Sequence, residues 1–309
     1  MRIKELYNSA VRRLVAADIS DPQLEVAVLL GHILDMDRAQ LFLAAEQDVP
    51  RPQIDSFENF LQRRLHREPT AYILGECEFW SLPFRVTQDV LIPRPETEFL
   101  LEMTLQKVRS GKDVSPGPVL DLCTGSGVIA IVLALEMEQW PEIYGADYSV
   151  QALRVAQANA ALHGVAERVR YINSDLFSAF GPGTQFGLIV SNPPYVEQEM
   201  IESGDKGSTA VLQPEVVEHE PHLALDGGKK GLEVIEKIAA GIPGVLKPGG
   251  WFFMEIGAGQ AEFVMELFQS LCCFDIMHIY HDYGGQPRVF QARRQGVGSA
   301  SPTVKVAHG

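Results

Sequence analysis

The segment Val119-Leu-Asp-Leu-Cys-Thr-Gly-Ser-Gly127 joins a short apolar run to a glycine-rich loop, and an apolar stretch continues over residues 128–137. The run predicts a buried strand, and the stretch after the glycines predicts a helix. Gly125 and Gly127 allow a tight turn and a close approach of the backbone to a ligand. The free N–H groups at the start of the helix can receive a carboxylate or a phosphate. This pattern favours a cofactor site but does not choose the cofactor, since dinucleotide enzymes use a similar loop.

Strands and helices alternate on the C-terminal side of this loop. The predicted strands are residues 119–123, 143–147, 169–173, 186–191, 251–256, 274–280 and 289–292. The predicted helices are residues 128–137, 150–163, 230–240 and 260–270. The alternation predicts an α/β fold with a mostly parallel sheet and helices on both faces. Residues 196–221 are acidic with little periodicity and predict a long loop, which in a compact domain is often functional.

The N-terminal side of the chain has a different pattern. Residues 3–15 and 53–66 have apolar residues at helical spacing, and residues 25–34 are rich in Leu, Val and Ala. Ser20-Asp21-Pro22 predicts a helix start with a capping side chain before a first-turn proline. A partial alternation over residues 79–90 predicts a hairpin, and a helix is expected over residues 96–109. The sequence thus predicts a helical domain (1–75), a linking hairpin (76–95), an α/β domain (96–294) and a disordered tail (295–309).

Composition restricts the class of protein. The 309 residues are 46% hydrophobic, which is enough for a sizeable core, yet no apolar run reaches the roughly 18 residues of a membrane span. The charged, amphipathic start does not resemble a signal peptide, so a cytoplasmic location is expected. A formal net charge of −14 makes stable nucleic-acid binding unexpected. The spacing of the four cysteines fits neither a zinc site nor a disulfide framework, and no metal site is predicted.

Two acidic residues follow the next predicted strands. Asp147 ends the second strand, where its carboxylate can accept hydrogen bonds from both ribose hydroxyls. Asp175 follows the third strand, next to Leu176, where it can meet an adenine amino group. Each acid alone is more often a helix cap or a solvated turn residue. Their order after the glycine loop is what favours a nucleoside-type cofactor.

Ser191-Asn192-Pro193-Pro194-Tyr195 follows the fourth predicted strand, at the sheet edge where open α/β sheets bind ligands. An ordinary turn also contains Asn and Pro. An amide or exocyclic amine nitrogen is a poor nucleophile because its lone pair is delocalised. The Asn192 side-chain oxygen and the Pro193 carbonyl can accept hydrogen bonds from both N–H groups of such a nitrogen. The proline rings restrict the backbone and so preorganise these two acceptors, and Tyr195 can stack on the planar amide or base. We therefore interpret Asn192, Pro193, Pro194 and Tyr195 as the catalytic and substrate-binding motif.

The order of these motifs resembles the site of class I methyltransferases. Successive strands are followed by a glycine loop, by two acidic residues and by Asn-Pro-Pro-Tyr. That resemblance implies a Rossmann-like, mostly parallel seven-stranded sheet and S-adenosyl-L-methionine as the cofactor. The candidate cofactor-binding residues are Asp121, Cys123, Thr124, Gly125, Ser126, Gly127, Asp147, Asp175, Leu176 and Asn192.

Further motifs resemble the HemK family of release-factor glutamine methyltransferases. The matching stretches are Arg67-Glu-Pro-Thr-Ala-Tyr-Ile-Leu-Gly75 with Glu78-Phe79, Leu91-Ile-Pro-Arg-Pro-Glu-Thr-Glu98, Asp121 to Gly127, Ser191 to Tyr195, Gln213-Pro214-Glu215, Glu220-Pro221 with Ala224-Leu-Asp-Gly-Gly228, Glu255-Ile-Gly257 with Gln260, and Gly285 with Arg288-Val289. The resemblance implies an N-terminal domain that helps dock a peptide chain release factor. It also implies methylation of the glutamine in that factor's Gly-Gly-Gln loop, with Arg94 and Glu96 as further substrate-binding residues. Glu255 is a minor candidate for the pocket lining.

Three positions depart from the family pattern. Cys123 stands where the family usually has glycine, and we expect it to favour a negative φ and to narrow the loop. Gly187 replaces a usual Asp, and Leu176 stands where an aromatic residue can stack on adenine. The chain's own Gly284-Gly285-Gln286 is interpreted as a turn between the last two strands and not as a self-substrate.

Other functions remain open at this point. One is a glutamine methyltransferase for a ribosomal protein. A nucleic-acid adenine or guanine amine methyltransferase shares Asn-Pro-Pro-Tyr but predicts a basic face and a pocket for a flipped base. A binding module without catalysis predicts the loss of Asn192, Pro193 or Asp147, and all three are present.

Overall fold

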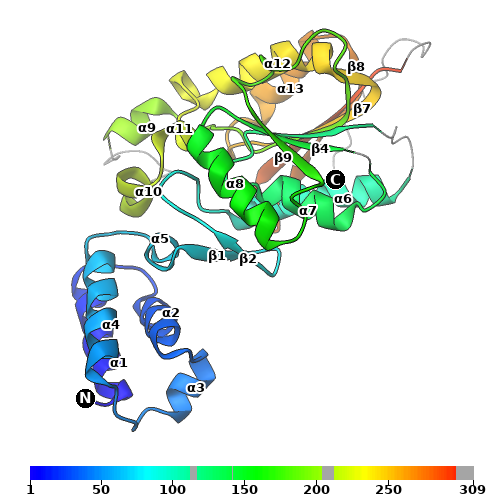
Figure 1. Cartoon of the computed structure of the whole chain (residues 1–309). Helices are drawn as coiled ribbons and strands as arrows, with labels where there is room; N and C mark the ends of the chain where they lie inside the picture. Colours follow the sequence, from blue (N-terminus) through cyan, green and yellow to red (C-terminus); the bar gives the residue numbers. More distant parts are fainter. Residues whose placement is uncertain (112–116, 141, 204–211, 297–309) are drawn as a thin grey trace. The chain divides into compact units, whose positions relative to one another are not determined.

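The computed structural model describes residues 1–111, 117–140, 142–203 and 212–296 (Figure 1). The chain divides into two compact units, one of Met1–Glu76 with Leu212–His219 and one of Cys77–Val211 with Glu220–Gly309. The sequence places residues 212–219 in a loop of the α/β domain, whereas the structure assigns them to the helical unit. The predicted disordered tail lies outside the described residues from residue 297 onward.

The first unit is helical. Its helices are α1 (Ile3–Ala16), α2 (Pro22–Leu34), α3 (Arg38–Leu43), α4 (Arg51–Leu65), α5 (Thr70–Leu74) and α10 (Pro214–His219). Its core is formed by apolar residues of α1, α2 and α4, among them Leu14, Leu29, Leu30 and Phe57. The buried Arg64 in α4 forms ion pairs with Glu25 in α2 and Glu215 in α10. This charge cluster explains why α10 belongs to the helical unit.

The start of α2 corrects one prediction. The helix does begin at Pro22, but Asp21 adopts a left-handed conformation and its side chain makes no capping hydrogen bond. Side-chain capping needs an extended backbone at the cap residue, which brings the side-chain oxygen toward the first N–H groups. The proline, and not the predicted cap, therefore marks this helix start.

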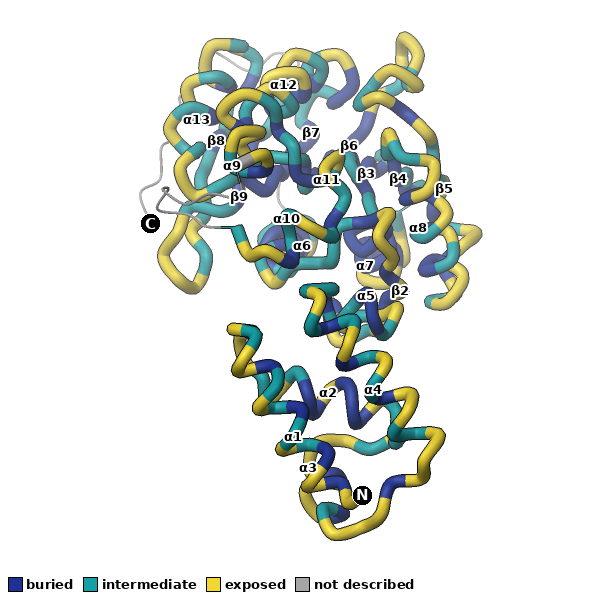
Figure 2. Tube along the Cα trace, turned by 90° about the vertical axis from the view of Figure 1, so that its left-hand side faces the viewer, coloured by how far each residue is buried: buried dark blue, intermediate teal, exposed yellow. Residues whose placement is uncertain are grey.

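The second unit contains a seven-stranded sheet in the order β5-β4-β3-β6-β7-β9-β8. The strands are β3 (Val119–Leu122), β4 (Ile143–Asp147), β5 (Val169–Asn173), β6 (Phe186–Ser191), β7 (Leu246–Glu255), β8 (Phe274–His281) and β9 (Pro287–Arg294). Neighbouring strands pair in parallel from β5 to β7, and β9 is antiparallel to both β7 and β8. The predicted mostly parallel sheet is confirmed. The strands β3 and β6 are buried along their whole length (Figure 2).

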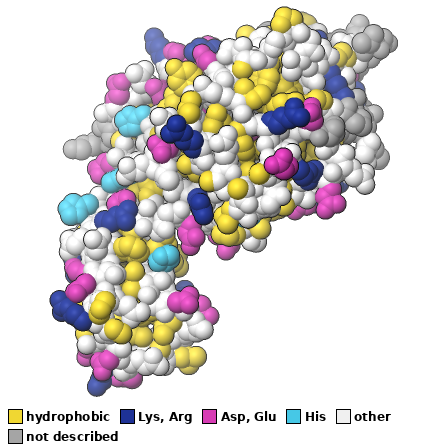
Figure 3. Space-filling model, in the orientation of Figure 1, with side chains coloured by type: hydrophobic (Ala, Val, Ile, Leu, Met, Phe, Trp, Pro, Cys, Tyr) yellow, Lys and Arg dark blue, Asp and Glu magenta, His cyan; other side chains and the backbone are white. Residues whose placement is uncertain are grey.

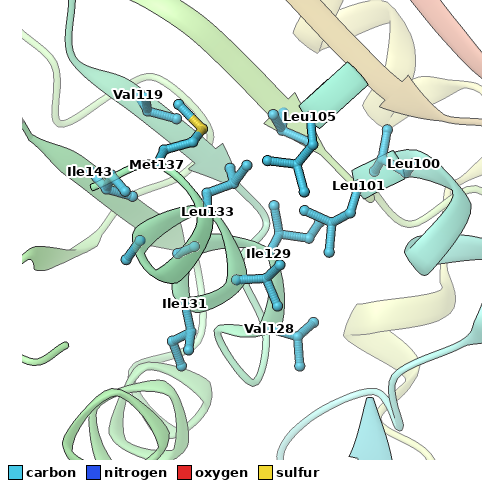
Figure 4. Packing of buried hydrophobic residues seen from close by; sticks show 14 of the residues in the cluster. Leu100, Leu101, Leu105, Val119, Val128, Ile129, Ile131, Leu133, Met137 and Ile143 are labelled. Atoms are coloured by element: carbon cyan, nitrogen blue, oxygen red, sulfur yellow. The ribbon is translucent and has the colours of Figure 1, made fainter. Parts of the chain in front are cut away.

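Helices cover both faces of this sheet, with α12 and α13 on one side and α6, α7 and α8 on the other (Figure 1). The bounds are α6 (Pro95–Arg109), α7 (Val128–Glu136), α8 (Val150–Leu162), α12 (Glu233–Val245) and α13 (Ala261–Ser270). Side chains alternate along β7 because successive residues of a strand point to opposite faces. Trp251 and Phe253 pack with α6 and α7, whereas Phe252 and Met254 pack with α12 and α13. Figure 4 shows the first of these cores, where leucines of α6 meet Ile129 and Leu133 of α7.

Short elements differ most from the sequence predictions. The hairpin has the strands β1 (Glu76–Phe79) and β2 (Leu82–Arg85), so it ends earlier than predicted. The predicted loop 196–221 contains α9 (Gln198–Ser203) and α10, and α11 (His222–Leu225) follows it. A single helical turn shows no periodicity, so such helices escape pattern analysis.

A 3₁₀ turn (Lys229–Gly231) with a left-handed Lys230 precedes α12, which therefore begins at Glu233, later than predicted. The turn between β8 and β9 contains Gly284-Gly285-Gln286, as predicted.

The sheet register brings the motifs to one edge. Leu122 at the end of β3 pairs with Ala146 of β4 and with Ser191 of β6, and Asp147 pairs with Asn173 of β5. The loops that follow these four strands therefore start side by side. No helix within the described ranges is long and apolar enough to span a membrane.

Candidate active site

A cavity of about 400 Å³ opens at this carboxyl edge of the sheet, which is within the range of small-molecule sites. Its wall combines the loops after β3, β4, β5 and β6 with residues 88–93 and 221–226. The predicted site residues that line it are Cys123, Thr124, Gly125, Ser126, Asp147, Asp175, Leu176, Asn192 and Pro194. The predicted site residues outside the lining are Asp121, Gly127, Pro193, Tyr195, Arg94 and Glu96.

The glycine loop needs left-handed backbone at three positions. Cys123, Gly125 and Gly127 have φ of 63°, 54° and 85°. The expectation of a negative φ at Cys123 is therefore wrong. The loop is fixed from outside, because the N–H of Thr124 donates to the carbonyl of Ala146 in the neighbouring strand at 3.0 Å. Such a tertiary hydrogen bond can override the conformational preference of a single residue.

Gly127 serves packing more than ligand contact. A Cβ atom at this position would lie 2.9 Å from the Cβ of Ala156 in α8 and 2.9 Å from the hydroxyl of Tyr171. Both distances are shorter than van der Waals contact. Glycine thus lets α7 begin directly against α8, behind the cavity wall.

Asp121 connects the glycine loop to α7 through its side chain. Its fully buried carboxylate accepts a hydrogen bond from the Thr124 hydroxyl at 2.5 Å and one from the N–H of Ala130 in α7 at 3.0 Å. Burial raises the pKa of Asp121 to about 7, against the effect of these two hydrogen bonds. The residue fixes the end of β3 against the first turn of α7 and does not form part of the cavity surface.

Asp147 is a partly buried acidic residue in the cavity wall. Its two oxygens accept the N–H groups of Gly125 at 2.9 Å and Ser149 at 2.8 Å. Burial raises its pKa, and these backbone hydrogen bonds oppose the shift. Each oxygen retains a lone pair for a further donor. A carboxylate held in this way beside the glycine loop fits a ligand with a vicinal diol, such as a ribose. Asp175 and Leu176 line the cavity after β5.

The Asn-Pro-Pro-Tyr segment belongs to a buried hydrogen-bond network. The Asn192 Nδ2 donates to Thr97 Oγ1 at 2.9 Å, and Thr97 Oγ1 donates to Glu255 Oε2 at 2.8 Å. The Tyr195 hydroxyl donates to Glu255 Oε1 at 2.9 Å. Pro193, the second residue of this segment, is buried. Sequence reasoning assigned no role to Thr97 and only a minor one to Glu255. The signal was present in the motif stretches 91–98 and 255–257, but the contact between them is long-range.

The Arg94 side chain forms an ion pair with Glu220, whose side chain is only 1% exposed. The N–H of Ile92 also donates to Glu220 at 3.3 Å. Burial raises the pKa of Glu220, and the charge of Arg94 opposes the shift. This pair joins the two segments that flank the cavity, 88–93 and 221–226. Glu96 lies close enough to the motif for its charge to contribute to the raised pKa of Tyr195.

These features define the class of the protein. The strand order, the cavity at the carboxyl edge, the glycine loop, the two acids and Asn-Pro-Pro-Tyr together are those of a class I methyltransferase. The cofactor of this enzyme is S-adenosyl-L-methionine, and the volume of the cavity and the carboxylate of Asp147 fit its adenosine part. Among the described residues, no group of three or more His, Cys, Asp or Glu is placed to hold a metal ion.

Comparison with known proteins then places the chain within that class. Residues 5–75 match the family model of the PrmC N-terminal domain, and residues 95–211 match that of the methyltransferase small domain. A release factor glutamine methyltransferase of Koribacter versatilis is 40% identical over 95% of this chain and 99% of its own length. One of Chlorobaculum tepidum is 37% identical over 91% and 93%. The chain belongs to the family of release factor glutamine methyltransferases.

Solved structures support the fold alone. The hMettl16 catalytic domain, in complex with the MAT2A 3'UTR hairpin 1, has a TM-score of 0.55 and 13% sequence identity. The match covers 84% of this chain and 86% of that domain. At this identity the likeness concerns the shared architecture and not the substrate.

Proposed function

We propose that this enzyme transfers the methyl group of S-adenosyl-L-methionine to the side-chain amide nitrogen of the glutamine in the Gly-Gly-Gln loop of peptide chain release factors. The proposal is carried by one observation, the orientation of Asn192 at the cavity wall. Its amide nitrogen is held by Thr97, so its oxygen remains to accept a hydrogen bond from an incoming N–H. The relatives named as release factor glutamine methyltransferases support the same substrate class.

The main task of this site is to orient the substrate amide toward the methyl group of the cofactor. The cofactor provides an electrophilic methyl group on a sulfonium sulfur. A glutamine amide is planar, with its lone pair delocalised into the carbonyl. The Asn192 oxygen and the Pro193 carbonyl would accept hydrogen bonds from the two N–H groups of this amide and direct its nitrogen toward the methyl group. Held in this way, the acceptor reacts by an in-line displacement that positioning accelerates.

The helical unit would dock the release factor. The exposed large apolar side chains of its helix α3, Phe42 and Leu43, support this role, since 82% and 84% of their surface is accessible. Exposed apolar residues of this size often belong to protein interfaces. Because release factors act in translation termination, we propose a cytoplasmic location for the enzyme.

A nucleic-acid substrate is less well supported. On the face seen in Figure 3, the Lys and Arg side chains form separate spots, several of them beside Asp or Glu. A long nucleic-acid ligand is usually held by a continuous basic surface. A ribosomal protein glutamine shares the acceptor chemistry and is therefore a required comparison in any test.

The proposal is tested by methyl transfer from labelled S-adenosyl-L-methionine to purified, unmodified release factor. A release factor with Gln→Ala in its Gly-Gly-Gln loop is the control for the acceptor. We expect label in the unaltered factor and none in the variant. Label in ribosomal protein or RNA, with none in the release factor, would refute the substrate and leave the cofactor site intact.

A further inference from the structure

Glu255 lies behind the cavity wall, where it touches neither the cavity nor solvent. It ends β7, is fully buried and receives hydrogen bonds from two hydroxyl groups, those of Thr97 and Tyr195. Thr97 belongs to the first turn of α6 and is itself 2% exposed. A buried carboxyl costs free energy unless it is well hydrogen-bonded. The two hydroxyl donors offset this cost and connect the carboxyl of Glu255 to α6 and to the Asn-Pro-Pro-Tyr segment.

The network has a fixed direction that follows from the chemistry of its members. An ionised carboxylate can only accept hydrogen bonds. The hydroxyl of Thr97 carries one hydrogen, and that hydrogen is given to Glu255 at 2.8 Å. Toward Asn192, Thr97 can then only accept. The Asn192 amide must present its nitrogen to Thr97, at 2.9 Å, and its oxygen to the opposite side.

We propose that Glu255 is a positioning residue for methyl transfer: through Thr97 it sets which end of the Asn192 amide faces the acceptor, and it also fixes the Tyr195 hydroxyl. This inference rests on the proposed function, in which the Asn192 oxygen accepts an N–H of the substrate. With the amide turned over, its NH₂ group would face the N–H bonds of the substrate. The acceptor nitrogen would then lose a hydrogen-bond acceptor and its orientation.

The groups around Glu255 have opposing effects on its pKa. Burial raises its pKa, whereas the hydrogen bonds from Thr97 and Tyr195 and the charge of Arg288 lower it. Glu96 adds a smaller contribution that raises the pKa. Burial is the larger effect and the pKa is raised overall, so the direction of the network rests on its geometry, in which each carboxylate oxygen accepts a hydrogen bond from a hydroxyl group.

Two pairs of substitutions test the inference. Glu255→Leu removes both acceptors and frees the Thr97 hydroxyl to donate to Asn192, whereas Glu255→Gln can keep its carbonyl toward Thr97 and its NH₂ toward Tyr195. Thr97→Val removes the hydroxyl at nearly constant volume, whereas Thr97→Ser retains it. We expect Glu255→Leu and Thr97→Val to lower kcat roughly ten- to hundredfold, as expected for a misplaced acceptor. Glu255→Gln and Thr97→Ser should stay within a few-fold of the unaltered enzyme.

The readouts separate positioning from a structural role. The affinity for S-adenosyl-L-methionine, measured by calorimetry, and the cooperative thermal unfolding should change little in all four variants. If Glu255→Leu does not fold, the Thr97 pair alone carries the test. Equal kcat in Thr97→Val and Thr97→Ser, or a loss that follows cofactor affinity, would overturn the inference. Absence of transfer to the release factor by the unaltered enzyme would instead refute the proposed function.

Discussion

Asp121 shows how a residue of the cofactor motif acts without touching the cavity. Its carboxylate connects Thr124 in the loop to the first turn of α7, and its other oxygen has no hydrogen-bond partner. Burial raises its pKa to about 7. Because an unfolded aspartate has a pKa near 3.8, the folded state retains a proton that the unfolded state has lost between these two values. Stability conferred by this group is therefore highest at low pH and falls as the pH rises toward 7.

Substituting Asp121→Asn removes this dependence. The Asn side-chain oxygen can still accept from Thr124 and Ala130, but the side chain carries no charge at any pH. We expect the difference in melting temperature between the variant and the unaltered protein to increase from pH 5 to pH 8 in favour of the variant. At pH 8 this corresponds to a gain of a few kcal/mol in the free energy of unfolding. Thermal unfolding followed by circular dichroism at several pH values measures this. A melting difference that is constant across the range would show that Asp121 ionises normally.

At the same scale, the motif residues were predictable and their supports were not. The glycine loop, Asp147, Asp175 and Asn192 each follow a strand in sequence, so their convergence follows from the parallel sheet. Thr97 carries no such signal, because its role depends on Glu255, 158 positions away. The left-handed Cys123 was predicted wrongly, since its conformation is set by a hydrogen bond from the adjacent Thr124 to another strand.

At the scale of elements, the segment before α6 and the segment before α11 are joined by Arg94 and Glu220. Both segments flank the cavity. The pair is asymmetric, since 30% of the arginine side chain is exposed but only 1% of the glutamate side chain. Loss of the arginine would leave a buried charge without its partner, which is the costly way to break a buried ion pair.

We expect Arg94→Met to lower the free energy of unfolding by roughly 2–3 kcal/mol, somewhat less than for a fully buried pair. The double variant Arg94→Met with Glu220→Gln should recover part of that loss, because no buried charge remains. Urea unfolding of the two variants and the unaltered protein measures both effects. An Arg94→Met protein as stable as the unaltered one would show that the ion pair with Glu220 does not stabilise the fold.

The regular elements of the sheet followed from sequence more closely than the connecting ones. The bounds of β4, β5 and β6 agree with the prediction. β6 is a short apolar run that is buried throughout, whereas β5 lies at the edge of the sheet and has only Val169 buried. The short helices α9, α10 and α11 were missed because each is too short to show a period. The β7 strand begins at Leu246, earlier than predicted, since the Pro-Gly-Gly run 248–250 suggests a turn.

At the scale of the whole molecule, the chain combines a helical unit with a methyltransferase unit. The helical unit takes in α10 through the pairing of Glu215 with Arg64, so a segment distant in sequence completes it. Neither pattern nor composition predicts this, because a six-residue helix and one buried arginine carry no long-range signal.

The docking role of the helical unit gives a prediction at this scale. Replacing both Phe42 and Leu43 by serine should raise the KM for intact release factor roughly tenfold, with kcat unchanged, because two apolar side chains are lost from the interface. Stability should be unaffected, since both side chains are exposed in the free enzyme. Steady-state methylation kinetics measures this. A short peptide containing Gly-Gly-Gln is the control, and an equal rise in KM for the peptide would argue against docking.

The identity of the methylated atom distinguishes the proposed reaction from every alternative substrate. Tandem mass spectrometry of release factor incubated with the enzyme and S-adenosyl-L-methionine locates it, with an Asn192→Ala enzyme in parallel. We predict one added methyl group on the side chain of the Gly-Gly-Gln glutamine, reduced roughly a hundredfold or more in initial rate by Asn192→Ala. A methyl group on any other residue, or an undiminished rate with Asn192→Ala, would contradict the account.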